Sequence, residues 1–123
     1  MLCVSHCNRI GPVDVYLVPH HGGADVADPA TFAVLRPPVA NINNGPVKGG
    51  AAVIFDALRE AEGIEDVWQL HLSLAEDAEN FSAARVANLD TQTNDWIKLS
   101  ANVDGSFRIL NGRTGELKSY DAR

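Results

Sequence analysis

The sequence feature that most constrains the fold is an apolar run that ends abruptly at two histidines and two glycines. Residues 13–19 are apolar apart from Asp14 and Tyr16, and a His-His-Gly-Gly segment follows directly at positions 20–23. Such a run is typical of a buried strand in an open α/β sheet, where ligands bind in the loops at the carboxyl ends of the strands. Neighbouring residues on an extended backbone point to opposite faces, so one imidazole is expected to enter a given pocket unless the turn at Gly22 redirects the other.

Length and composition indicate one small soluble domain. The chain has 123 residues, of which 46% are hydrophobic and 21% are charged. A net charge of −6 with scattered Lys and Arg argues against a nucleic-acid surface. No window reaches the roughly 18 apolar residues of a membrane span, and the start does not have the pattern of a signal peptide. We therefore expect a cytoplasmic location for the chain as written, although full-length relatives of such a protein include exported ones.

Two cysteines lie close together near the start of the chain. The order Cys3, His6, Cys7 resembles part of a zinc site, but a structural zinc site needs four ligands and no second pair follows. The sequence therefore favours free thiols in a poorly ordered start over residues 1–10. A local disulfide is the alternative in an oxidising compartment.

Helices and strands are expected to alternate after the first strand. Asp28 and Pro29 are typical of a helix start, with Asp28 as the cap, and Pro37-Pro38 stops that short helix. We expect a strand over 39–44, a glycine-containing loop over 45–50, a helix over 51–62 and a strand over 67–73. Two strand-helix-strand passages imply parallel pairing, which gathers His20, His21 and His71 on one edge of the sheet.

The last third of the chain changes character. Residues 74–95 are acidic and polar, and we expect a long, partly helical excursion over the strand ends that acts as a lid. The alternation in residues 96–100, the turn signal Asp104-Gly105 and two further strands over 106–110 and 116–120 predict an antiparallel meander.

Several segments together carry a resemblance to a known family. They are the strand and His-His-Gly-Gly of residues 11–23, Asn43-Asn44-Gly45, Lys48-Gly49-Gly50, Trp68-Gln69-Leu70-His71 and Trp96-Ile97-Lys98-Leu99-Ser100. From about residue 8 to residue 120 the chain resembles the C-terminal half of a metallo-β-lactamase-fold hydrolase, in the bacterial branch that includes the hydrolase-like domain of the DNA-uptake competence channel. The resemblance implies an α/β fold in one domain over residues 1–123. Its parts are the second half of an αββα sandwich, a mixed sheet with two covering helices, and a C-terminal antiparallel β-meander.

The resemblance also implies chemistry. Members of the family hold zinc or manganese, which activates a water, and His20, His21 and His71 are the metal-ligand candidates in this chain. Each has a structural alternative as a strand-end histidine that bonds to the backbone or to a neighbour. The family's His-x-His-x-Asp-His motif does not occur in the sequence. We therefore expect a truncated chain that starts downstream of the first half and is inactive or weakly active alone.

Other polar residues near the histidines are candidates for supporting roles. Asn44 and Lys48 are candidates for substrate contacts, with turn formation and simple solvation as their alternatives. Asp25 and Asp28 are candidates for orienting an imidazole, although Asp28 also suits a helix cap. No catalytic nucleophile is marked, because no serine lies in a Gly-x-Ser-x-Gly turn.

Three functions are consistent with the sequence. The first is a truncated metal-dependent hydrolase, whose expected partner is the missing N-terminal half. The second is a non-catalytic domain that pairs through an exposed sheet face with itself, as a homo-oligomer, or with another subunit. The third is a small intact enzyme with a reduced metal site of His20, His21 and His71. The substrate does not follow from the fold, because relatives cleave phosphodiesters, lactams, thioesters and lactones.

Overall fold

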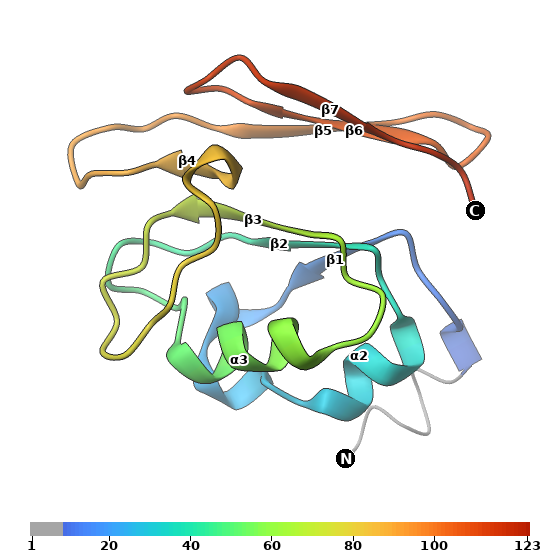
Figure 1. Ribbon diagram of the computed structural model, residues 1–123, viewed down its shortest axis with the longest axis horizontal. Coiled ribbons are helices and arrows are strands. Elements are labelled where there is room, and N and C mark those ends of the chain that lie inside the picture. The colour runs from blue at the N-terminus through green and yellow to red at the C-terminus, as the bar shows by residue number, and fades with distance from the viewer. Residues whose placement is uncertain (1–8) are drawn as a thin grey trace.

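The computed structural model describes residues 9–123, so the predictions for Cys3, His6 and Cys7 lie outside the described residues. These residues form three layers (Figure 1): helices at the bottom, a parallel sheet in the middle and an antiparallel sheet on top. The mixed α/β class is confirmed. The expected mixed sheet under the helices is wrong, because all four of its strands are parallel. The expected C-terminal antiparallel meander is confirmed as a separate three-stranded sheet.

The parallel sheet contains four strands in the order β1-β2-β3-β4. They are β1 (Val15–Val18), β2 (Val39–Ile42), β3 (Asp66–His71) and β4 (Val86–Asn88). Every neighbouring pair is parallel, so the carboxyl ends of all four strands lie at one edge, as the sequence predicts for the first three. β1 is an edge strand of this sheet.

Two helices cover one face of the parallel sheet. The helix α2 (Pro29–Leu35) begins where predicted, and the Asp28 carboxylate caps it by accepting a hydrogen bond of 3.0 Å from the Ala30 amide. The second helix, α3 (Ala52–Glu60), is shorter than the predicted 51–62 at both ends. The core between helices and sheet consists of Val18, Phe32, Ala40, Ile42, Ile54, Phe55, Ala57, Leu58 and Val67.

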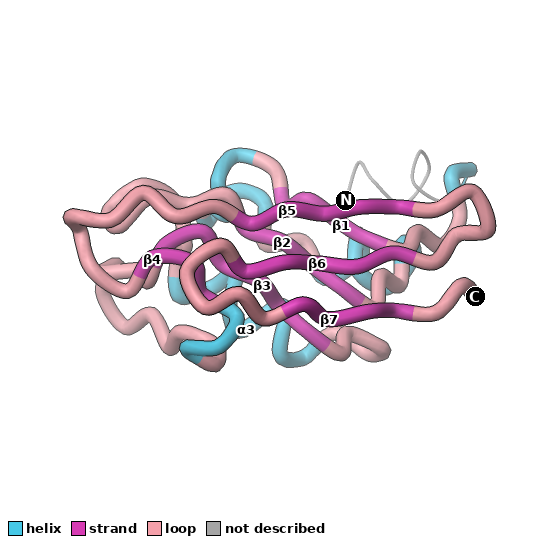
Figure 2. Tube along the Cα trace, turned by 90° about the horizontal axis from the view of Figure 1, so that it is seen from above, coloured by secondary structure: helices cyan, strands magenta, loops and turns pink. Residues whose placement is uncertain are grey.

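The antiparallel meander covers the other face of the parallel sheet. Its strands are β5 (Ile97–Ala101), β6 (Phe107–Asn111) and β7 (Leu117–Tyr120), and Figure 2 shows them lying over the parallel strands. A second core between the sheets contains Val39, Trp68, Phe107, Ile109 and Tyr120. The expected bare apolar face of the parallel sheet is therefore wrong, because the chain's own meander buries it.

Residues 74–95 are not the predicted helical excursion. They contain one short helical turn, η3 (Ala83–Arg85), followed by β4, whose three residues are all buried beside β3. The Asn80 side chain ties the preceding loop down, because Asn80 Oδ1 accepts hydrogen bonds of 2.7 Å from the Ser73 amide and from Gln69 Nε2. This part of the segment is therefore a component of the sheet layer and not a lid.

Within residues 9–123, no helix has the length and the apolar character that crossing a membrane requires.

Candidate functional site

The His-His-Gly segment forms a left-handed turn at the carboxyl end of β1. The backbone φ angles are 50° at His20, 56° at His21 and 73° at Gly22, within the short helical turn η1 (His20–Gly22). Left-handed backbone is strained for residues other than glycine, at a cost on the order of 1–3 kcal/mol each, and such strain concentrates at functional sites. Two adjacent strained histidines are therefore the strongest local sign of function in the described residues.

The loop after β2 holds this turn in place. The Gly50 amide donates a hydrogen bond of 3.0 Å to the His21 carbonyl, and the Ala51 amide donates one of 3.0 Å to the Gly22 carbonyl. Gly49 lies so close that a Cβ there would be 1.8 Å from the His21 carbonyl oxygen. Because only glycine permits this approach, Gly49 has a structural role in holding the turn.

The His21 ring is oriented by the same loop. His21 Nδ1 lies 2.8 Å from the carbonyl oxygen of Asn43, and a carbonyl can only accept, so Nδ1 carries the proton. The other ring nitrogen, Nε2, is then the atom that can accept a proton or bind a cation. A histidine that donates its second N–H to a backbone carbonyl is the arrangement that metal ligands and catalytic bases share.

The His20 ring is oriented by a carboxylate. His20 Nδ1 lies 2.8 Å from Asp25 Oδ2 and 2.9 Å from Oδ1, and Asp25 belongs to the short turn η2 (Ala24–Val26). The hydrogen bond from His20 lowers the pKa of the Asp25 carboxyl below its ordinary value. A Cβ at Gly23 would lie 2.8 Å from Asp25 Oδ1, so the glycine leaves room for this pair. The prediction that Asp25 orients an imidazole is confirmed.

His71 occupies a different environment at the end of β3. Its backbone is tied to the Asn44 side chain, and its Nδ1 is buried with no hydrogen-bond partner among the described residues. Within residues 9–123, no group of three or more His, Cys, Asp or Glu side chains is arranged to hold a metal ion. His20, His21 and His71 therefore do not make a zinc or manganese centre by themselves, and their predicted role as ligands stays a prediction.

The two predicted substrate contacts differ in exposure. Asn44 is 1% exposed, and its amide donates to the His71 carbonyl at 2.9 Å and accepts from the His71 amide at 3.2 Å. It therefore connects the loop after β2 to the end of β3. Lys48 is exposed at the tip of the same loop. Neither contact with a substrate is tested by this geometry, and both stay predictions.

A cavity that the sequence did not reveal lies at the same edge of the sheet. It has a volume of about 290 Å³ and is lined by Leu17, Asn41, Asn43, Leu70 and Ile97, which come from β1, β2, β3, the loop after β2 and β5. The cavity thus opens between the two sheets. No local pattern could have indicated it, because Ile97 is far along the chain from the other four residues.

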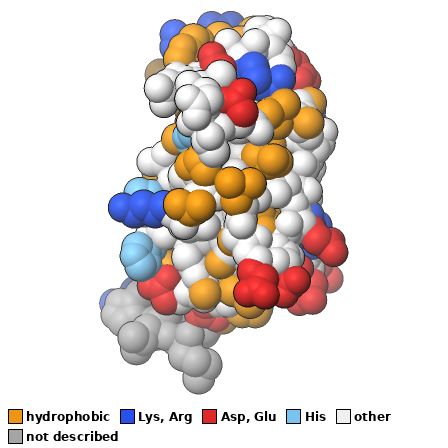
Figure 3. Space-filling view, turned by 90° about the vertical axis from the view of Figure 1, so that its left-hand side faces the viewer, with side chains coloured by type: hydrophobic (Ala, Val, Ile, Leu, Met, Phe, Trp, Pro, Cys, Tyr) orange, Lys and Arg blue, Asp and Glu red, His pale blue; other side chains and the backbone are white. Residues whose placement is uncertain are grey.

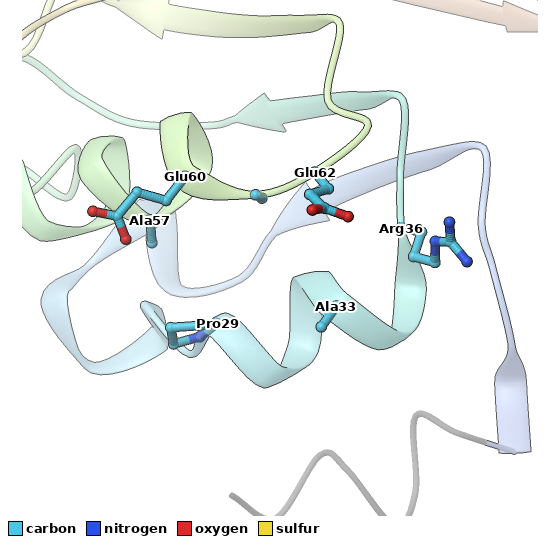
Figure 4. A pocket seen from close by; sticks show the side chains of 7 residues that line it. Pro29, Ala33, Arg36, Ala57, Glu60 and Glu62 are labelled. Atoms are coloured by element: carbon cyan, nitrogen blue, oxygen red, sulfur yellow. The ribbon is translucent and has the colours of Figure 1, made fainter.

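Figure 3 views the end of the molecule where the parallel strands finish. Histidine side chains and a basic side chain protrude along one border of this face, next to a band of hydrophobic side chains. A larger cavity of about 530 Å³ lies between α2 and α3 (Figure 4), and its wall includes Arg36, Glu60 and Glu62 but no histidine. It is therefore separate from the site around His20 and His21.

Comparisons of this chain with protein-family models, with curated proteins and with solved structures find no match.

Proposed function

We propose that this chain acts as the C-terminal portion of a metal-dependent hydrolase of the metallo-β-lactamase superfamily, and that its metal loop with the motif His-x-His-x-Asp-His lies on another segment. In this proposal His20 and His21 form part of the rim of the active site. The observation that carries the proposal is the strained His20-His21 turn at the carboxyl edge of a parallel sheet, with both Nδ1 atoms already hydrogen-bonded. The order of layers, helices, then one sheet, then a second sheet, agrees with three of the four layers of an αββα sandwich.

The donor set of the described residues does not fit a complete metal centre. Two imidazoles oriented through Nδ1 suit metal ligation, but a catalytic zinc needs three protein ligands. No chemical step is therefore assigned to a metal held by this chain alone. The chain itself provides two ring nitrogens, His20 Nε2 and His21 Nε2. Each can accept a proton or act as one ligand of a cation.

Calorimetric titration with zinc tests this proposal in the full chain with Cys3 and Cys7 changed to Ser, so that the partial zinc motif near the start does not add its own heat. We expect binding weaker than about 1 µM for this chain, because two ligands leave the site incomplete, and loss of the heat when His20 and His21 are both changed to Ala. A replacement of the exposed Arg108 on β6 by Ala is the control and is expected to leave the heat unchanged. An absence of heat up to about 1 mM zinc contradicts the proposal. Nanomolar binding contradicts the claim that the site is incomplete.

The alternative, a non-catalytic domain that associates through a sheet face, finds less support. The apolar face of the parallel sheet is buried by the meander, and the exposed positions of the meander include Lys98 and Arg108 as well as Leu117. A mass from light scattering that equals one chain at about 100 µM protein is expected if the first proposal is right. A stable dimer at that concentration favours the alternative.

A further inference from the structure

We propose that the cavity between the two sheets binds an uncharged ligand group, a small ring or short aliphatic chain that carries one O–H or N–H. The walls are three aliphatic side chains, Leu17, Leu70 and Ile97, and two amides, Asn41 and Asn43. No charged side chain lines the cavity. The cavity is open to solvent on the side of Leu17, which is 60% exposed, and its wall offers a charged ligand no opposite charge, so a neutral ligand is favoured.

The volume sets the size of the ligand. About 290 Å³ is at the lower end of the range for small-molecule sites, whereas an apolar cavity of about 150 Å³ already holds benzene. The cavity therefore has room for one ring with a short substituent. It does not have room for a nucleotide or a peptide of several residues.

In this proposal the polar group of the ligand forms a hydrogen bond with the side-chain amide of Asn41. Asn41 projects from β2 toward the meander, and its Oδ1 is buried with no hydrogen-bond partner among residues 9–123. No internal hydrogen bond to Oδ1 therefore fixes the amide, and a half-turn about the last side-chain bond exchanges its donor and its acceptor. In the observed orientation Oδ1 is out of reach of solvent, so a ligand hydroxyl or amide pairs with it only after this half-turn, and it then recovers the bond that the protein itself does not make.

The position of the cavity connects it to the histidines. Asn43, which lines the cavity, is also the residue whose carbonyl accepts the hydrogen bond of 2.8 Å from His21 Nδ1. Leu17 lies three residues before His20 and is 60% exposed, so an apolar side chain stands at the edge of the cavity toward solvent. A ligand seated here lies beside the His20-His21 turn, and its role as the apolar part of a substrate rests on the proposed function, whereas the binding itself does not.

Titration of the full chain with benzyl alcohol, followed by NMR of the Leu and Ile methyl groups, tests the proposal. We expect saturable shifts centred on Leu17, Leu70 and Ile97, and affinity at least about fivefold tighter than for toluene, which has the same ring without the hydroxyl. Benzoate, which carries a charge, is expected to give no saturable shift. If benzyl alcohol gives no saturable shift at about 20 mM, or benzoate binds equally well, the proposal is overturned.

Three variants locate the binding. Leu17→Asp places a charge at the cavity and is expected to weaken the affinity for benzyl alcohol at least about tenfold. Leu117→Asp, on β7 and 52% exposed, is expected to leave this affinity unchanged. Asn41→Leu is expected to abolish the preference for benzyl alcohol over toluene while toluene still binds. Equal loss in both Asp variants, or a preference that survives in Asn41→Leu, overturns the assignment. No metal or hydrolysis enters these measurements, so their failure leaves the zinc titration to decide the proposed function separately.

Discussion

The Tyr120 hydroxyl donates a hydrogen bond of 2.6 Å to Asp66 Oδ2, and this bond joins the last strand of the meander to the start of β3. Lys118 and Arg85 also bond to the same carboxylate, and Trp68 Nε1 donates to the Tyr120 oxygen at 3.0 Å. The polar cluster therefore fixes the meander over the parallel sheet at the end opposite to the histidines.

Asp66→Asn is expected to reduce the free energy of unfolding by about 2 kcal/mol, because it removes the carboxylate that pairs with Lys118 and Arg85 and leaves Arg85 only its ion pair with Glu116. Urea unfolding measures the difference. The matched control is Asp14→Asn, whose ion pair with Arg123 is more exposed and is expected to change stability by under about 1 kcal/mol. Equal effects of the two variants contradict the structural role of the cluster.

The cluster around Asp66 also makes the free energy of unfolding depend on pH. Burial raises the pKa of Asp66, but hydrogen bonds from Lys118, Tyr120 and Arg85 outweigh burial and hold the pKa below its ordinary value. A carboxyl with a lowered pKa in the folded state stabilises the fold above its unfolded pKa of 3.8, and that contribution is lost as the pH falls through the folded pKa. We expect the free energy of unfolding to fall less between about pH 5 and about pH 2 in Asp66→Asn than in the wild type. Parallel pH curves for the two proteins contradict this account.

The pair of His20 and Asp25 is testable through the carboxylate. His20→Ala removes the donor of the hydrogen bond that lowers the pKa of Asp25, so this pKa is expected to rise toward 3.8, as measured by carbon NMR of the carboxyl group. His21→Ala serves as the control and leaves the pair intact. Gly23→Ala is expected to act like His20→Ala, since its φ of −69° tolerates alanine but the new Cβ lies 2.8 Å from Asp25 Oδ1. A pKa that does not move in either variant argues against the pair.

The contact between Gly49 and the histidine turn predicts a large difference between two glycine variants. Gly49→Ala combines a φ of +71° with a Cβ 1.8 Å from the His21 carbonyl oxygen, whereas Gly115→Ala has a φ of +76° and no heavy atom within 4 Å. Gly115→Ala is therefore expected to cost about 1 kcal/mol from backbone strain alone, and Gly49→Ala about 3 kcal/mol or more. Thermal unfolding of the two variants makes the comparison. Similar costs would mean that the loop after β2 does not pack against the turn.

Asn41→Leu provides a stability measurement that is independent of any ligand. Its buried Oδ1 has no partner among the described residues, so an aliphatic side chain of similar size is expected to raise the free energy of unfolding by about 1 kcal/mol. Urea unfolding of the variant and the wild type in the absence of added ligand checks this. A loss of stability instead indicates that the amide makes a bond, for example to water, that holds β2 in place.

Local chemistry in the sequence accounts for much of the architecture. The apolar run before His20, the cap Asp28 with Pro29, and the alternation around Asp104-Gly105 each act over a few residues. The strands and the helix that these three signals predict form close to their expected positions. The parallel strand order also followed from the sequence, because strand-helix-strand passages leave few other arrangements.

Tertiary structure alone decided the rest. Val86–Asn88 is too short and too polar in its surroundings to signal a strand, and it becomes one because β3 offers an unpaired edge. No local signal in the meander directs it onto the parallel sheet. It packs there because burying Trp68 against Phe107 and Tyr120 removes apolar surface from water. The left-handed turn at His20 and His21 and the cavity beside Asn41 have the same origin: both depend on residues distant in the chain, Gly49 for the turn and Ile97 for the cavity, which only packing brings into place.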